Sequence, residues 1–296
     1  MESAIHVLAL FPGQGSISPG AGRAWRNDDA WRLVDEASAL SGVDVAHLLL
    51  SAEDDELVRT DNAQIATFVL SLMSYQSFCR TRSTPESFVG HSLGEYSALT
   101  AAGMLSFADG VRLVAARGAA MLKASQLQPG AMAALMGGHG DISKVTARGD
   151  VWLANVNGFD QLVVAGTEDG IDYLEENVNS LGWKRCRRLK VGGAFHSPLM
   201  APASADLSEA LRHVEFRTTP HRVFSNVDGD LHPDTAEWPQ LCLRQLTEPV
   251  QFERCVTNAT AEANVAVEFE PTGVLRGLVR RISPNLDVTE FPGGSL

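Results

Sequence analysis

The fold class of this chain is indicated by one stretch of its sequence, Ser87-Phe88-Val89-Gly90-His91-Ser92-Leu93-Gly94. A short run of strand character leads into two glycines, which stand two residues before and two residues after Ser92, and helical character follows to about Ala102. In so tight a turn, side chains at Gly90 and Gly94 would clash with the neighbouring strand and helix. Strand, sharp turn and helix in this order are typical of a nucleophile elbow in an α/β sheet.

The elbow makes Ser92 a candidate nucleophile. The turn pushes the serine oxygen into the open, and the helix that starts at Leu93 aims unpaired backbone N–H groups and a positive dipole end at the place where an oxyanion would form. The bare pattern Gly-x-Ser-x-Gly is common by chance. It is the strand before it, ending at Val89, that favours a catalytic serine.

Upstream of the elbow the sequence predicts the first unit of an α/β sheet. Ile5 to Leu10 is an apolar run of strand length, and it is followed by the turn-forming residues Phe11-Pro12-Gly13-Gln14-Gly15-Ser16. Apolar residues then recur at helical spacing from Trp25 to Leu50 and again from Asn62 to Arg80. We therefore expect a strand, a glycine loop and helices before the elbow.

The segment that follows Pro129 predicts a separate unit. Its expected order is strand, helix, strand, strand, helix, strand, which is the split arrangement of a ferredoxin-like unit. We therefore predict an α/β body made of residues 1–129 and 192–296, with residues 130–191 inserted between Pro129-Gly130 and Gly192-Gly193. The expected elements of the insertion are Ala131–Met136, Asp141–Arg148, Val151–Asn155, Gln161–Ala165, Asp169–Leu181 and Lys184–Val191.

Composition limits the possible functions. The 296 residues, 45% hydrophobic and 20% charged, suit a soluble globular protein, and no apolar run reaches the roughly 18 residues of a spanning helix. The N-terminus lacks a basic region and a small-residue cleavage site, so we expect a cytoplasmic chain without a membrane partner. A net charge of −12 disfavours nucleic acid as a partner. Neither a metal site nor a disulfide framework is expected, because the cysteines lack such spacing: Cys79, Cys186, Cys242 and Cys255.

One histidine is the candidate base. His196 lies in Gly193-Ala194-Phe195-His196-Ser197-Pro198-Leu199-Met200, just past a glycine joint and before an expected helix, at a domain boundary where clefts form. His91 flanks the nucleophile, and it either points into the site or packs as a polar residue. The other histidines stand in ordinary strand, helix or loop contexts, where a surface or structural role is expected: His6, His47, His139, His213, His221 and His232.

Arg117 gives a clue to the substrate. Ser106 and Asp109 have the spacing of a capping box, so a helix is predicted from about Phe107 to Ala124. A guanidinium keeps its proton, so its burial is costly unless an anion meets it. Two interpretations stay open: an internal partner such as Glu95 or snorkelling to water, and a bidentate clamp on a substrate carboxylate. Arg117 shares its helix face with apolar residues three or four positions away: Leu113, Val114, Ala120 and Met121.

Together these features resemble the malonyl-CoA:acyl carrier protein transacylases and the related acyltransferase domains of polyketide synthases. The resemblance covers nearly the whole chain. Where this family usually has a glycine-proline-glycine turn, the chain has Glu270-Pro271-Thr272-Gly273, a departure that concerns a loop and not the chemistry. The resemblance is carried by five motifs in order: Phe11-Pro12-Gly13-Gln14-Gly15-Ser16; Gly90-His91-Ser92-Leu93-Gly94-Glu95-Tyr96-Ser97-Ala98; Ala116-Arg117-Gly118 with Met121; Gly193-Ala194-Phe195-His196-Ser197-Pro198-Leu199-Met200; and Arg244-Gln245-Leu246 followed by Pro249-Val250-Gln251.

The resemblance implies a role for each matching residue. Ser92 matches the acylated nucleophile and His196 matches its base. The backbone N–H groups of Gln14 and Leu93 match the oxyanion hole. Arg117 matches the residue that pairs with the malonyl carboxylate, and His91 is expected beside the substrate.

The resemblance also implies the fold, the substrate and the partner. Gln245 matches a position whose main-chain carbonyl orients the histidine, which fits the lack of an evident third acid between Ser92 and His196. The family fold pairs a large α/β-hydrolase-like body with a small ferredoxin-like subdomain, in agreement with the predicted insertion. The implied substrate is malonyl-CoA or a related thioester, no cofactor is implied, and the implied partner is an acyl carrier protein. We expect a monomer.

Phe195 bears on the substituent of the acyl unit. In polyketide acyltransferases a bulky aromatic residue near the histidine is associated with malonyl, and a serine there with methylmalonyl. Ala194-Phe195-His196 resembles the malonyl pattern, although Gly193 departs from the histidine often found at its start. Phe195 either occupies the space of a 2-methyl group or simply packs in the core. Hydroxy- and amino-substituted malonyl units stay open.

A basic run stands out in this acidic chain. Lys184-Arg185-Cys186-Arg187-Arg188-Leu189-Lys190 holds five positive charges in seven residues. Such a patch would steer an acidic carrier protein or contact CoA phosphates. Alternatively, charges on the edge strand of a ferredoxin-like sheet deter aggregation.

Two other functions compete with acyl transfer. A serine thioesterase or other hydrolase would share the elbow and the base, but it would need a second acid and has no use for Arg117. A non-catalytic scaffold would share the fold, but the intact set of Ser92, His196, Gln14 and Arg117 argues against decay. Fatty acid and polyketide synthesis are both compatible with these residues.

Overall fold

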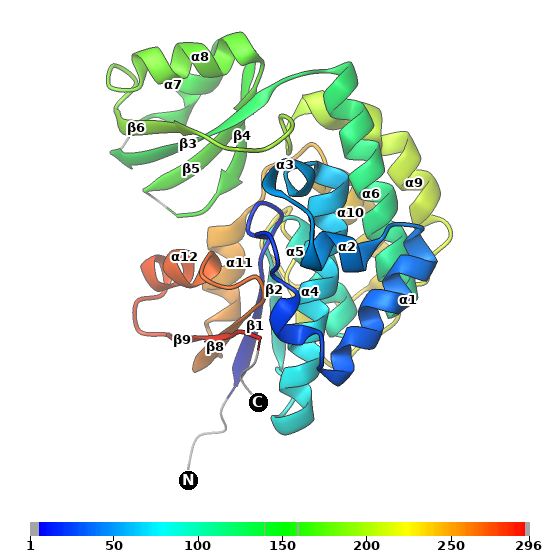
Figure 1. The fold of residues 1–296 in the computed structure, drawn as a ribbon. Helices are drawn as coiled ribbons and strands as arrows, with labels where there is room; N and C mark the ends of the chain where they lie inside the picture. The colour runs from blue at the N-terminus through cyan, green and yellow to red at the C-terminus, as the bar shows by residue number, and fades with distance from the viewer. Residues whose placement is uncertain (1–5, 139, 159, 294–296) are drawn as a thin grey trace.

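The computed structural model describes residues 6–138, 140–158 and 160–293, and within them lie two β-sheets (Figure 1). The larger sheet has five parallel strands in the order β7-β2-β1-β8-β9. The smaller sheet has four antiparallel strands in the order β4-β5-β3-β6. Two residues named above, Ile5 and His139, lie outside the described residues.

The parallel sheet forms the centre of the body, because its inner strands are apolar on both faces. Alternate residues of β1 enter two different cores: Ala9 and Phe11 pack on one side of the sheet, and Leu8 and Leu10 on the other. The predicted strands before the glycine loop and before the elbow are both present. The strands of this sheet are β1 Val7–Phe11, β2 Ser87–Gly90, β7 Arg222–Val223, β8 Val265–Phe269 and β9 Asp287–Phe291.

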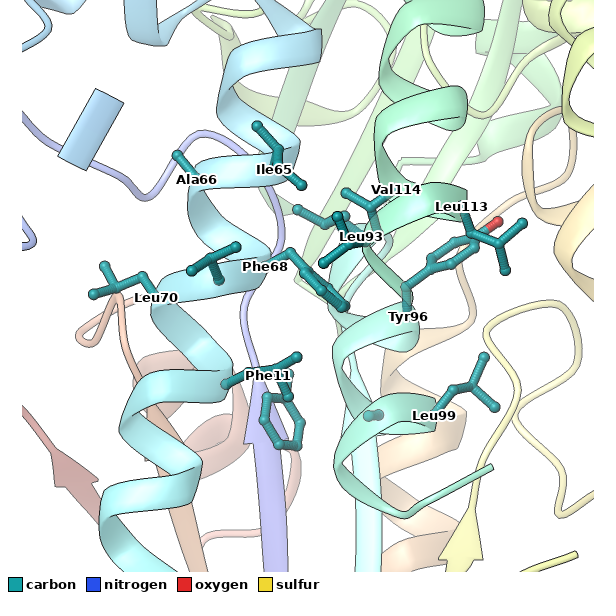
Figure 2. Packing of buried hydrophobic residues seen from close by; sticks show 14 of the residues in the cluster. Phe11, Ile65, Ala66, Phe68, Leu70, Leu93, Tyr96, Leu99, Leu113 and Val114 are labelled. Carbon is teal, nitrogen blue, oxygen red and sulfur yellow. The ribbon is translucent and has the colours of Figure 1, made fainter. Parts of the chain in front are cut away.

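Long helices cover one face of this sheet. Figure 2 shows Phe11 of β1 near Phe68 of α4, with Tyr96 of α5 and Val114 of α6 on the far side of the same apolar cluster. Two short helices pack on the opposite face, where Leu8 and Leu10 point. The first group comprises α4 Thr60–Thr81, α5 Leu93–Ala101 and α6 Phe107–Leu127, and the second α11 Phe252–Ala259 and α12 Leu275–Ile282.

The capping box predicted for α6 is present, since Ser106 Oγ accepts a hydrogen bond of 3.0 Å from the backbone N–H of Asp109. The helix continues three residues beyond the predicted end at Ala124. The connecting elements of the body are η3 Pro198–Ala203, α9 Ser204–Leu211, η4 Thr235–Glu237 and α10 Trp238–Gln245.

The helical spacing noted from Trp25 to Leu50 corresponds to several short helices. Asp28 Oδ1 accepts from the backbone N–H of Ala30 and starts a new turn there, and Gly42 adopts a left-handed conformation that ends the next helix. Periodicity alone did not show these interruptions. The region contains η1 Arg23–Trp25, η2 Asp29–Trp31, α1 Arg32–Ser41, α2 Val45–Leu50 and α3 Asp54–Leu57.

The antiparallel sheet has the predicted order of elements, and the predicted fold class is confirmed. Its two helices cover the outer face, where Leu135, Val164 and Leu174 form a small core of their own (Figure 1). The other face turns toward the body. The domain limits at residues 130 and 191 stay a prediction. The elements are β3 Ala131–Gly138, α7 Ile142–Thr146, β4 Val151–Val156, β5 Gln161–Gly166, α8 Glu168–Asn177 and β6 Trp183–Arg188.

None of the helices in the described part of the chain combines the length and the apolar character that crossing a membrane requires.

Candidate active site

Ser92 sits at a strained turn between β2 and α5. Its φ of 54° and ψ of −110° lie outside the usual regions for a residue with a side chain. A Cβ atom at Gly94 would lie 2.0 Å from the carbonyl oxygen of Phe11, and one at Gly90 would lie 1.9 Å from the backbone of Gly94. The two glycines are therefore required by close packing, as the sequence predicts.

The structure brings Ser92 and His196 together. Ser92 Oγ lies 2.7 Å from His196 Nε2, and His196 Nδ1 lies 2.7 Å from the main-chain carbonyl oxygen of Gln245. A carbonyl can only accept a hydrogen bond, so Nδ1 carries the proton and Nε2 is left to accept the serine proton. His196 also has a positive φ of 58°, which shows that its backbone is held in place by its surroundings.

Burial and charge keep this histidine neutral. Burial is the main cause that lowers the pKa of His196 to about 3, and the positive charge of Arg117 lowers it further, while the hydrogen bond that Nδ1 donates to the carbonyl oxygen of Gln245 acts in the opposite direction. A neutral imidazole with a free Nε2 is the form that a general base requires. At neutral pH, His196 is therefore in the form that can accept the proton of Ser92.

Arg117 is fully buried beside the nucleophile. Its Nη2 lies 3.4 Å from Ser92 Oγ and 3.0 Å from Gln245 Oε1, while Nη1 donates to Gln64 Oε1 at 2.6 Å. Snorkelling to water is therefore excluded. Glu95 does not pair with the guanidinium directly, because the Gln245 side chain lies between them and binds both. The hydrogen-bond partners of Arg117 are neutral, so its charge is available to an anion.

The two predicted oxyanion donors belong to the residue after Ser92 and to a loop that lines the same cavity. Leu93 is the first residue of α5, where backbone N–H groups have no carbonyl of a preceding turn to bind. Gln14 lies in the loop after β1, and this loop is held against the elbow: a Cβ at Gly13 would lie 2.7 Å from the carbonyl oxygen of His91. The Gln14 side chain is fixed by Thr60, whose Oγ1 donates to its Oε1 at 2.8 Å.

A cavity of about 400 Å³ opens onto the serine. His91 lines the cavity and is also packed as a polar residue, so both interpretations made from the sequence apply. Its Nε2 lies 2.8 Å from Asn157 Oδ1, and the centroid of its ring lies 5.0 Å from that of Phe252. Phe195 also lines the cavity and is almost fully buried. The remaining walls come from the antiparallel sheet, from α12 and from loops, and include Gln14, Met132, Ala134, Val163, Leu189 and Leu275.

Comparison with known proteins agrees with this geometry. A family model described as "Acyl transferase domain" matches residues 9–283. The chain belongs to this acyltransferase family. A curated relative, the malonyl CoA-acyl carrier protein transacylase of Bacillus subtilis, is 38% identical over 289 residues, which cover 95% of this chain and 91% of the relative.

Solved structures of acyltransferases are similar over nearly the full chain. A malonyl-CoA:acyl carrier protein transacylase from Xanthomonas oryzae pv. oryzae superposes with a TM-score of 0.93 at 31% identity, covering 99% of this chain and 96% of that one. A second structure is described as a type II PKS acyl-carrier protein in complex with its malonyl-transacylase, and it gives a TM-score of 0.91 at 30% identity, covering 98% and 97%.

The basic run of this acyltransferase is divided between the two faces of its sheet. Directly opposite residues of an antiparallel pair share a face, and Arg187 stands opposite Ala134, which lines the cavity, while Arg188 stands opposite Ala133, which packs under the helices. The docking role expected for Arg188 stays a prediction, and its guanidinium binds three acids of α8: Glu168, Asp172 and Glu175.

The rest of the basic run is exposed. Arg185 stands opposite Met136, on the same face as Arg187, and neither arginine has an ion-pair partner in the described part of the chain. Lys184 and Lys190 are exposed as well. The predicted location of this run on an edge strand is confirmed, since β6 ends the order β4-β5-β3-β6.

Several site residues of the acyltransferase were not predicted from the sequence. Gln64 is a buried polar residue among apolar neighbours on a helix, so the reasoning applied to Arg117 would have found it. Asn155 and Asn157 alternate along one strand and its end, and both lie at the cavity. Asn226 follows a strand of only two residues, which is too short to give a periodic signal.

Proposed function

We propose that this chain transfers a malonyl-type acyl group from coenzyme A to the phosphopantetheine thiol of an acyl carrier protein. The observation that carries the proposal is the buried guanidinium of Arg117, 3.4 Å from the oxygen of a serine that is hydrogen-bonded to a neutral histidine. The pair supplies the chemistry of acyl transfer, and the cation selects a carboxylated acyl group. The relatives compared above carry names that describe this activity.

In the first half-reaction Ser92 becomes acylated. His196 Nε2 accepts the serine proton as Oγ attacks the thioester carbonyl, and the backbone N–H groups of Gln14 and Leu93 stabilise the oxyanion. The intermediate then collapses: the carbon–sulfur bond breaks, and the CoA thiolate takes the proton from His196. The product is an acyl-serine ester and free CoA.

In the second half-reaction the carrier thiol enters the same cavity. His196 accepts its proton as the sulfur attacks the ester carbonyl, the carbon–oxygen bond breaks, and Ser92 recovers its proton from His196. These steps move an acyl group and protons between groups of the chain and the two thiols. We therefore propose that no resident cofactor takes part, with the CoA thioester as substrate.

The cavity has room for a specific acyl unit. Phe195 and His196 are neighbours at the cavity wall, so the aromatic ring is proposed to fill the space that a 2-methyl substituent would need. We accordingly propose malonyl as the acyl unit. A cytoplasmic location and a monomeric state are part of the same proposal, as expected for an enzyme that meets CoA thioesters and a carrier protein.

The carrier is proposed to dock over the cavity-facing side of β6. Arg185 and Arg187 are exposed and have no ion-pair partner among the described residues, and they share a face with Met136 and with Ala134, which lines the cavity. A positive patch here would attract an acidic carrier to a protein whose net charge is −12, and it would do so beside the opening that the phosphopantetheine arm must enter.

Intact-mass analysis tests the proposal. The protein is exposed to malonyl-, methylmalonyl- and acetyl-CoA and then to holo acyl carrier protein, with Ser92→Ala as control. We expect a malonyl adduct on the wild type only, followed by its appearance on the carrier. Release of free malonate instead of transfer would indicate a thioesterase, and the absence of any adduct would contradict acyl-serine chemistry.

A further inference from the structure

Glu95 is a fully buried carboxylate that the proposed mechanism does not use. It lies on the first turn of α5, three residues after the nucleophile. Both of its oxygens are engaged: Oε1 accepts from the backbone N–H of Asn226 and Oε2 accepts from Gln245 Nε2, each at 2.5 Å. Burying a carboxyl group in a protein core is costly, and these two bonds offset part of that cost.

The first of these partners fixes the nucleophile. Asn226 turns its side chain to the elbow, where Oδ1 accepts from the backbone N–H of Ser92 at 2.7 Å and Nδ2 donates to the carbonyl oxygen of Gly90 at 2.8 Å. The strained backbone of Ser92 is thus held on both sides by one amide. Glu95 anchors the main chain that carries this amide.

The second partner fixes the base. The Gln245 side chain donates to the carbonyl oxygen of Ser92 at 3.0 Å and accepts from Arg117, while its main-chain carbonyl holds His196 Nδ1 at 2.7 Å. The residue that orients the histidine is therefore itself oriented by Glu95. Glu95 therefore adds a connection between nucleophile and base, 104 residues apart in the chain, beside the direct bonds of Gln245 Nε2 to the carbonyl oxygen of Ser92 and to Asn226 Oδ1.

We propose that Glu95 is a positioning residue, which sets the distance between Ser92 and His196 by holding Asn226 with one oxygen and Gln245 with the other. The inference rests on the proposed function, because it concerns the rate at which Ser92 is acylated. It assigns to Glu95 no contact with the substrate. A carboxylate suits the task because it offers two acceptors to two N–H donors, whereas an amide at this place would turn an NH₂ group toward one of them.

A simpler alternative is that Glu95 only balances the charge of Arg117. Two features favour positioning. The Gln245 amide separates the two groups, so Glu95 does not form an ion pair with the guanidinium. Burial also raises the pKa of Glu95 to about 7, because it outweighs the Asn226 N–H and the charge of Arg117, which both lower this pKa. Glu95 therefore does not carry a permanent negative charge at neutral pH.

The test compares Glu95→Gln and Glu95→Asp with the wild type. Malonyl-CoA acylation is followed by rapid quenching and intact-mass analysis to obtain kcat and KM, and the urea unfolding midpoint is measured for each protein. Glu95→Gln keeps the size but loses one acceptor. Glu95→Asp keeps the charge but is one methylene too short to reach both donors.

We expect both variants to lose about 100-fold in kcat with KM changed less than threefold, because a shift of about 1 Å between reacting groups costs that much while Arg117 and the cavity stay in place. The proton on His196 Nδ1 should also shift in NMR spectra of both variants. The matched control is Glu86→Gln, a carboxylate that accepts from the N–H of Val7 at 2.7 Å at the other end of the sheet. It is expected to change stability and leave kcat as it is.

Three results would overturn the inference. If Glu95→Asp matches the wild type while Glu95→Gln is impaired, only charge matters. If KM rises in both variants together with the fall in kcat, as expected when a substrate contact is removed, Glu95 is not a positioning residue. If both are as active as the wild type, it has no role in the reaction. A wild type that is not acylated by malonyl-CoA would instead contradict the proposed function.

Discussion

Replacing Arg117 with alanine is expected to erase the preference for carboxylated acyl groups. The guanidinium donates to neutral oxygens of Gln64 and Gln245, so its charge is left for the substrate. A charge-assisted hydrogen bond is worth about 1.5 to 3 kcal/mol, which corresponds to roughly a tenfold to 150-fold preference. Arg117→Ala should therefore accept acetyl-CoA about as well as malonyl-CoA.

The assay measures kcat/KM for acylation of Ser92 by each thioester, from the mass adduct formed at short times. Arg117→Lys is the matched variant, because it keeps a positive charge but lacks the planar fork that fits a carboxylate, and it should retain part of the preference. Urea unfolding midpoints are needed for both variants, since the substitution leaves two amide oxygens in the core without their donor. The Ser92→Ala variant shows whether any residue other than Ser92 becomes acylated.

The reasoning would be refuted by a folded Arg117→Ala protein that still prefers malonyl-CoA tenfold or more. Equal losses with both thioesters would also contradict it. In that case Arg117 would act on Ser92, 3.4 Å away, rather than on the substrate carboxylate.

Three further predictions follow from the site and its surface. Arg185→Glu with Arg187→Glu should slow transfer to the carrier about tenfold or more at low salt and leave self-acylation unchanged, and equal effects on both steps would count against docking. Phe195→Ser should raise the use of methylmalonyl-CoA in competition with malonyl-CoA; an unchanged ratio would reduce Phe195 to core packing. The folded pKa of Glu95 is raised to about 7 from 4.5, so its contribution to stability is present below pH 4.5 and is lost as the pH rises to 7. Urea titrations should show the stability advantage of wild type over Glu95→Gln falling by about 3 kcal/mol across this window, and a constant difference would contradict the shift.

The elements were predictable wherever one local signal dominates. The elbow is encoded by Gly90 and Gly94, which no other residue could replace, and α6 is encoded by its capping box and its apolar face. The inserted unit was predictable because each of its short elements has a clear period. The stretch from Trp25 to Leu50 was not, because Asp28 and Gly42 divide one periodic pattern into several pieces.

Site residues could be predicted where a charged side chain stands among apolar ones in the sequence pattern. A cation on an apolar face drew attention to Arg117, and the structure buries it completely. Asn226 gave no such signal, since an amide near a loop is ordinary in sequence, and Gln245 was expected at the site only because of the family resemblance. Their roles come from contacts with Glu95 across more than 130 residues of chain, and only the tertiary fold supplies those.

The neutral oxygens around Arg117 explain why a dyad suits this site better than a triad with a third acid. A carboxylate in place of the Gln245 carbonyl would strengthen His196 as a base. Its charge would also attract the guanidinium of Arg117, which binds the side-chain oxygen of Gln245 at 3.0 Å, and it would compete with the substrate for that cation. With a carbonyl there, the charge of Arg117 helps to keep the pKa of His196 low while the site is empty. Once a malonyl carboxylate pairs with Arg117, that opposing charge is offset and the base becomes stronger. Under the proposed function, the substrate with the right carboxylate therefore helps to activate the serine that attacks it.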